Sequence, residues 1–176
     1  TGTLKLAASN STGVNLVSLP TVTASSPAAR IDGRLDLNPI DDNSRRIFKV
    51  PETPAAAELD ISAVVLNSHA TRRSGLDKSG LGALVLSGKN TYNGDTSISE
   101  GTLVVAADSA LGAASAGTIV EQGGTLAFQG SVAYTALEPV VLGSSGIGGV
   151  GAVNNISGNN VFPGPITVNQ PATISS

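Results

Sequence analysis

The sequence predicts an all-β protein that winds into a right-handed parallel β-helix, or β-solenoid, with irregular lateral loops. Three observations indicate this fold class: a glycine-led strand pattern that recurs, a spacing of about one solenoid coil between its copies, and a composition of small residues. Glycine provides 21 of the 176 residues, whereas aromatic residues make up 3% and charged residues 13% of the chain. Small aliphatic side chains of this kind pack well between flat, closely stacked strands.

The recurring pattern is Gly-x-aliphatic-x-aliphatic. Alternate side chains of a strand point to opposite faces, so the two aliphatic residues of each copy share one face. We expect these residues to stack along the solenoid axis as one core ladder. The predicted ladder consists of Leu4 and Leu6, Leu84 and Leu86, Leu103 and Val105, Leu126 and Phe128, and Ile166 and Val168.

The spacing between copies matches one turn of a solenoid. Copies that begin at Gly82, Gly101 and Gly124 lie 19 and 23 residues apart, near the roughly 20–25 residues of a solenoid coil. Clusters of asparagine, glycine, aspartate and serine between the copies are typical of turns. One coil buries too few aliphatic side chains to offset its chain entropy, so we expect neighbouring coils to stabilise each other.

The other segments vary in regularity. The chain opens on the strand pattern at Gly2, from which we expect residues 1–176 to be a single solenoid segment, an excerpt of a longer repetitive chain. Residues 20–60 contain five of the nine prolines, which predicts irregular, loop-rich coils with a lateral loop over residues 30–52. Residues 139–176 carry no charge. They are interpreted as a solenoid wall rich in glycine and asparagine, or as a packing surface for another chain or further coils.

Within this framework, one stretch carries a family resemblance. Residues 84–96 read LVLSGKNTYNGDT, and EGTL follows at residues 100–103 and ALG at residues 110–112. This stretch resembles the autotransporter-associated β-strand repeat, or passenger-associated transport repeat, of bacterial autotransporter-like surface proteins, with the best match over residues 81–128. Ala83, Asn93 and Asp95 depart from the family pattern, but none of them replaces an apolar ladder residue.

The resemblance implies a location and a role. It implies a passenger region that crosses the outer membrane through a separate C-terminal barrel and folds outside as a parallel β-helix, so the segment is expected to be extracellular or on the cell surface. The repeats of that family carry no catalytic residues to transfer.

Composition excludes several classes of function. The net charge is −3 and the basic residues are scattered, so no basic stripe is present to bind nucleic acid. The chain contains no cysteine, which excludes disulfides and thiolate metal sites. No apolar run reaches the roughly 18–20 residues of a membrane span, so we expect no membrane insertion by this segment.

Candidate metal and catalytic residues are sparse. His69 is the only histidine and lies in the turn-like stretch of residues 67–71, where a solvated loop histidine is the simpler interpretation than a catalytic base. Asp41, Asp42 and Asn43 offer only a weak set of oxygen ligands for calcium, and a plain polar turn is the preferred interpretation. We therefore expect no metal site.

Two glycine motifs resemble cofactor loops only superficially. Residues 146–151 match G-x-G-x-x-G, but neither a helix-forming segment nor an acidic residue follows, as a dinucleotide site requires. Gly88-Lys89 suggests a phosphate loop, but Asn90 stands where serine or threonine is needed. Tight turns between coils explain both motifs, and no cofactor is expected.

Parallel β-helices also occur among enzymes that cleave polysaccharides, which require clustered acids. The candidate pairs are Asp32 with Asp36 and Asp41 with Asp42. They lie in the least regular region, and the five aromatic residues of the chain, two Tyr and three Phe, form no evident platform for sugar rings. We therefore expect no enzymatic activity.

The leading functional hypothesis is a structural one. It is a stalk or fibre segment of a secreted, autotransporter-like surface protein, whose partners are neighbouring coils or identical copies. One alternative is an adhesin that binds a glycan or a host protein through lateral loops around residues 30–52. Another is a self-assembling extracellular filament subunit, since the open ends of a solenoid expose unpaired strand edges.

The register of the predicted ladder can be tested at Leu103. Leu103→Asp places a carboxylate in the stacked core, so we expect the surrounding coils to unfold, because a buried charge without a partner is costly. Thermal denaturation followed by circular dichroism measures this effect. A melting temperature equal to that of the unchanged chain would contradict the register.

Overall fold

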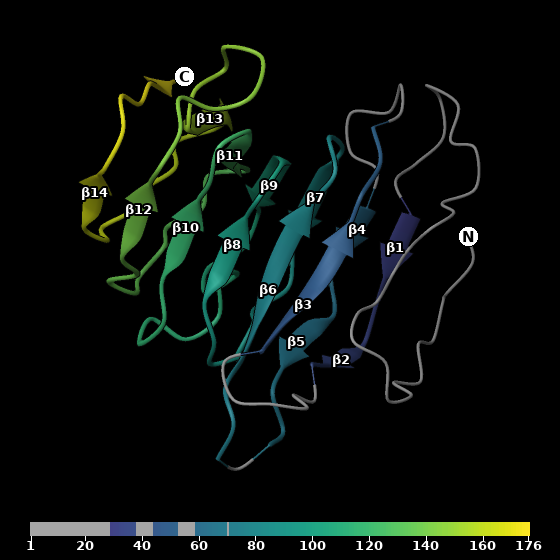
Figure 1. Cartoon of the computed structure of the whole chain (residues 1–176). Coiled ribbons are helices and arrows are strands. Elements are labelled where there is room, and N and C mark those ends of the chain that lie inside the picture. The colour runs from purple at the N-terminus through teal and green to yellow at the C-terminus, as the bar shows by residue number, and fades with distance from the viewer. Residues whose placement is uncertain (1–28, 38–43, 53–58, 70) are drawn as a thin grey trace.

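The computed structural model describes residues 29–37, 44–52, 59–69 and 71–176. All the regular secondary structure in these residues is β-strand. The strands pair in parallel between successive coils, and the chain passes repeatedly from one sheet to the next (Figure 1). The predicted all-β solenoid is therefore confirmed. No helix that could cross a membrane occurs in these residues.

Three sheets form the sides of the solenoid. The first has seven strands in the order β1 (Ala29–Ile31), β4 (Leu59–Ile61), β7 (Ala83–Leu86), β9 (Gly101–Val105), β11 (Gly124–Gln129), β13 (Val153–Ser157) and β15 (Ile174–Ser175). The second has six strands, and chain order runs β3 (Ser44–Lys49), β6 (Ser74–Ser79), β8 (Thr96–Ile98), β10 (Thr118–Val120), β12 (Val140–Leu142) and β14 (Ile166–Val168). The third contains β2 (Arg34–Asp36) and β5 (Val64–Leu66).

The third side continues beyond β5 as extended chain. The Thr91 amide donates to the Val65 carbonyl oxygen at 2.8 Å, which adds the next coil to β5. Further along, Ala133 and Val161 form an isolated parallel bridge. Each coil therefore has three sides, and backbone hydrogen bonds between coils run along the solenoid axis.

The core ladder occupies the inner face of the first sheet. Leu84, Leu103 and Leu126 are register partners on β7, β9 and β11, and each is at most 1% exposed. A second row holds Leu86, Val105 and Phe128, which are 0%, 0% and 5% exposed. Each buried side chain of this kind stabilises the fold by roughly 1.5–3 kcal/mol. Leu4 and Leu6, also placed in the ladder by the sequence, lie outside the described residues.

Ile166 and Val168 differ from the prediction. They lie on β14 of the second sheet, where they pair with Val140 and Leu142 rather than with the first-sheet ladder. They are 41% and 58% exposed, because β14 is the outermost strand of its sheet and has a neighbour on one side only. The sequence pattern led to this error because a glycine-led strand occurs in both sheets.

The leading glycine of the pattern is required by close packing between coils. Gly101 has φ +73°, and a Cβ atom there would lie 2.3 Å from the Gly80 carbonyl oxygen. This distance is too short for any side chain, and left-handed φ values also favour glycine. The glycine therefore lets the chain turn into β9 while touching the coil before it.

A lysine interrupts the inner row of the second sheet. Lys78 is fully buried, and its register partners are Phe48 and Ile98. Its Nζ donates to the carbonyl oxygens of Ser79, Gly80 and Glu100 at 3.1, 2.5 and 3.0 Å. A buried ammonium is tolerated when its donors are satisfied, and here it joins two coils at their corner.

Asn90 ties three coils together at another corner. Its Oδ1 accepts from the Val65 amide at 2.8 Å, and its Nδ2 donates to the Ala110 carbonyl oxygen at 2.6 Å. The side chain is only 3% exposed, so water cannot replace these two bonds. The side-chain amide of Asn90 thus supplies hydrogen-bond partners for backbone groups of the coils on either side of it.

Replacing this amide should destabilise the fold. Asn90→Ala leaves a buried amide and a buried carbonyl without partners, and we expect a loss of about 2–4 kcal/mol in the free energy of unfolding. Urea denaturation followed by circular dichroism measures it. The same change at exposed Asn159, Asn159→Ala, should cost under about 0.5 kcal/mol; equal effects at the two positions would contradict this role for Asn90.

Candidate functional site

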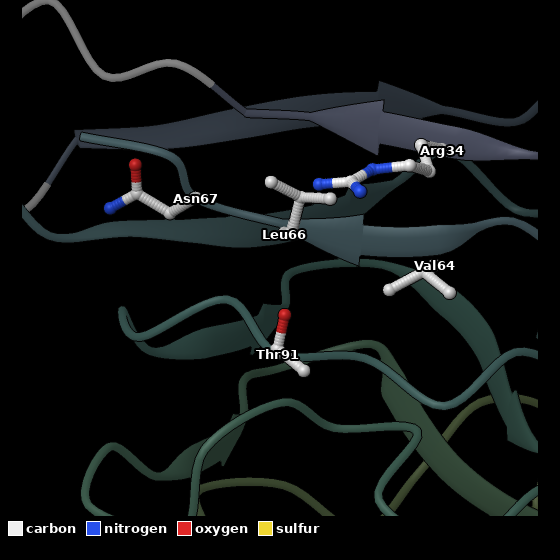
Figure 2. Close-up of a pocket in the computed structure, with 5 residues that line it drawn as sticks. All are labelled: Arg34, Val64, Leu66, Asn67 and Thr91. Atoms are coloured by element: carbon white, nitrogen blue, oxygen red, sulfur yellow. The ribbon is translucent and has the colours of Figure 1, made fainter.

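A shallow hollow lies on the third side of the solenoid. We call it the Arg34 groove; it measures about 220 Å³ and is lined by Arg34, Val64, Leu66, Asn67 and Thr91. These residues come from three successive coils: Arg34 from β2, Val64 and Leu66 from β5, and Thr91 from the coil that follows. Figure 2 shows Arg34, Val64 and Leu66 on the two strands, and Asn67 and Thr91 on the irregular chain beside them.

The floor of the groove is apolar and its rim is polar. Arg34 and Val64 are register partners on adjacent strands, and Leu66 is only 8% exposed. In Figure 2 the Arg34 side chain extends along the sheet so that its guanidinium lies near Leu66. Because residues two apart on a strand share a face, Val64 and Leu66 form one continuous aliphatic strip.

Asn67 fixes the loop at one end of the groove. Its Nδ2 donates to the Arg72 carbonyl oxygen at 2.6 Å and to Asn93 Oδ1 at 2.8 Å, while its Oδ1 accepts from the His69 amide at 3.0 Å. The amide is thus occupied by structural contacts. Its contribution to the groove is a fixed wall rather than free donors.

His69 has a structural part in the same loop. Its Nδ1 accepts from the backbone amides of Thr71 and Arg72 at 3.3 and 3.0 Å. The side chain is half-buried. A ring nitrogen that accepts two backbone hydrogen bonds holds a turn closed, which supports the interpretation of His69 as a loop residue.

The candidate acids Asp32 and Asp36 are held by structural contacts. Asp32 accepts from Ser62 Oγ and from Arg30 Nε, and these two hydrogen bonds lower the pKa of its carboxyl. Asp36 Oδ1 accepts from the Ser68 amide at 3.1 Å. An acid whose pKa is lowered is a poor proton donor at neutral pH, so Asp32 does not suit the role of a general acid.

The remaining sequence candidates are placed as follows. Asp41, Asp42 and Asn43 lie outside the described residues. In the part of the chain that the structure describes, no three His, Cys, Asp or Glu side chains gather as metal ligands would.

The glycine motifs serve packing between coils. The loop of residues 146–151 folds against β11: the Ile147 amide donates to Thr125 Oγ1 at 3.0 Å, and that hydroxyl donates to the Gly151 carbonyl oxygen at 2.8 Å. It leads into strand β13 rather than a helix. The Gly88 amide donates to the Ile61 carbonyl oxygen at 3.3 Å, so it is engaged by the neighbouring coil.

Glu138 is a buried acid that the sequence analysis did not single out. It is fully buried; its Oε1 accepts from Thr118 Oγ1 at 3.1 Å, and its Oε2 has no hydrogen-bond partner. Burial raises the pKa of its carboxyl to about 7; the Thr118 hydrogen bond opposes this rise, and the charge of Asp95 adds to it. Near neutral pH, Glu138 is therefore divided between its charged and neutral forms.

Glu138 should make stability depend on pH. Its pKa in the folded chain, about 7, lies above the ordinary value of 4.5, so the folded state keeps its proton to higher pH than the unfolded state. The stabilisation is complete below about pH 4.5 and is lost as pH rises to about 7, up to roughly 3 kcal/mol in all. We expect the urea midpoint to fall between pH 5 and pH 8.

The matched variants separate Glu138 from other carboxyls. Glu138→Gln stays neutral at every pH, so it should flatten the pH dependence and be more stable than the unchanged chain at pH 8. Glu52→Gln, at an exposed position, makes the same change in formal charge and should leave the dependence intact. A pH profile that is the same in all three chains would show that Glu138 is not responsible.

Comparison with known proteins identifies the repeat. Residues 76–105 match the family model of the passenger-associated-transport-repeat, which confirms the resemblance noted in the sequence. The matched span runs from β6 to the end of β9 and includes the buried lysine Lys78, the corner amide Asn90 and the leading glycine Gly101.

A curated relative is similar to this chain over a longer stretch than the family model covers. The adhesin BmaC autotransporter of Brucella suis biovar 1 (strain 1330) is 48% identical over 61 residues, which is 35% of this chain and 2% of that relative. The chain thus spans a small part of that relative's length. No solved structure matches the chain.

Proposed function

We propose that this chain, as a carrier of the passenger-associated transport repeat, is a rigid β-solenoid stalk segment in the surface-exposed passenger of an autotransporter. The observation that carries the proposal is the continuity of the first sheet through seven strands. With about 4.8 Å between neighbouring strands, this sheet extends roughly 30 Å along the axis. The work of such a segment is to hold other parts of a passenger away from the cell.

Rigidity follows from how the coils are joined. Each coil is bonded to its neighbours by backbone hydrogen bonds on three sides and by side chains such as Asn90 and Lys78 at the corners. Interactions of this nearest-neighbour kind add up along the stack. Bending the stack would open several of them on one side at once.

A non-catalytic role is part of the proposal. Asp32 and Asp36, two of the four acids considered for catalysis, have structural partners, and Glu138 lies fully buried away from solvent. The family model that matches residues 76–105 is named for passenger-associated transport, and the similar relative is named an adhesin. These features favour a structural or binding function over an enzymatic one.

Adhesion is the second candidate function. The relative named as an adhesin and the groove beside Arg34 favour it. The described residues between Arg30 and Glu52 include β1, β2 and β3, so a deletion of that stretch would remove strands of all three sheets. Substitution of exposed side chains is the better means of separating binding from folding.

Excision of one coil tests the stalk. Removing residues 101–123 joins Glu100 to Gly124, so the next leading glycine takes the place of Gly101 and β7 meets β11 in the same register. We expect the shortened passenger to fold and to reach the cell surface. Removing residues 101–122 is the matched control, because a slip of one residue turns ladder side chains to the opposite face.

The readout is surface labelling together with thermal denaturation. An epitope placed between Gly148 and Gly149, where the surroundings are open, should bind antibody on intact cells in the full-length protein and in the excision of residues 101–123. The one-residue slip should reduce both labelling and melting temperature. Labelling that requires cell lysis would contradict the surface location, and equal loss in both deletions would contradict the modular stalk.

A further inference from the structure

We propose that the Arg34 groove binds a single carboxylate-bearing sugar unit of an acidic glycan. This inference rests on the second candidate function, adhesion, and names the ligand class and the site. It follows from the charge at the rim of the groove, the nature of its floor, its size and the state of the backbone beneath it.

The charge comes from Arg34. Among the described residues, no acidic side chain lies within ion-pair distance of its guanidinium, whereas Arg30 on the preceding strand is paired with both Asp32 and Asp60. An arginine can bind a carboxylate through two parallel hydrogen bonds. The groove therefore presents one cationic fork to solvent beside an apolar surface.

The floor and the opposite wall suit a sugar ring. Val64 and Leu66 provide aliphatic carbon against which the C–H face of a pyranose can pack. The Thr91 side chain, one coil further along, can donate to or accept from a ring hydroxyl. One carboxylate contact, one hydroxyl contact and an apolar face together match a uronic acid residue.

The size limits how much of a glycan is held. The volume of about 220 Å³ is below the roughly 300–1,000 Å³ of sites that enclose a drug-sized ligand. One sugar unit fills it, with the rest of the glycan in solvent. Affinity for one unit is then weak, and firm attachment of a cell requires many copies acting together.

The backbone of the groove argues against a peptide ligand. Extended peptides bind by adding a strand to a free sheet edge. Here β2 pairs with β5, the Leu37 amide donates to the Leu66 carbonyl oxygen at 2.8 Å, and the Thr91 amide donates to Val65. Between β2, β5 and the Thr91 segment the backbone groups named above are already paired, so side chains are the available contacts there.

The experiment is an NMR titration of the whole chain with sodium D-glucuronate. We expect saturable shifts of the Arg34 Nε–Hε signal and of the methyl signals of Val64 and Leu66. Arg34→Gln should weaken glucuronate binding about tenfold, and Thr91→Val should weaken it less. The control Arg45→Gln removes the same charge from the second sheet and should leave binding unchanged, as D-glucose should leave the signals unshifted.

Several results would overturn the proposal. They are an absence of saturable shifts, equal weakening by Arg34→Gln and Arg45→Gln, or tighter binding of an acetylated tetraglutamate peptide at the same residues. Backbone spectra of each variant establish that the solenoid is intact. If cells lost adhesion with Arg34→Gln while the chain did not bind glucuronate, the ligand class would be wrong and the adhesin function would stand. Coil excision tests the stalk independently of Arg34.

Discussion

The structure depends on one constraint: successive coils must meet in register on three sides at once. Leu84, Leu103 and Leu126 lie over one another only because the backbone bonds of β7, β9 and β11 fix their relative positions. The corners then become the places where hydrogen bonding must be completed by other groups. Asn90 and Lys78 complete it with an amide and an ammonium. Gly101 has a different role at its corner, where it leaves room for the backbone of the neighbouring coil.

The groove is a consequence of the same arrangement. Strands on the third side are short, and after β5 the chain continues as extended backbone rather than as a regular strand. Side chains from three coils therefore surround a hollow that a longer, flatter sheet would fill. A scaffold held by many backbone bonds can carry such a site without moving when a ligand arrives, which is how rigid proteins commonly present binding residues.

The sequence predicts the repetitive part of this structure well and its corners poorly. A period of about one coil and alternating aliphatic residues were enough to identify the fold and six ladder residues from Leu84 to Phe128, because both depend on local pattern. The same pattern misassigned Ile166, since it does not tell one sheet from another. Val85, Val104 and Ala127, which alternate with the ladder residues along β7, β9 and β11, form a second buried cluster. Glu138 and the groove carry no local signal, because their surroundings come from residues in other coils.

The buried ammonium of Lys78 has a consequence for how coils can be ordered. Aliphatic rows are nearly interchangeable, so on hydrophobic contact alone one coil could stack on many others with similar energy. An ammonium is more selective. Lys78 takes two of its carbonyl acceptors, Ser79 and Gly80, from its own coil and the third, Glu100, from the next coil. A mismatched neighbour would therefore leave one buried donor without an acceptor. In a long array of similar repeats, a single polar residue of this kind distinguishes the correct neighbour from its many near-copies.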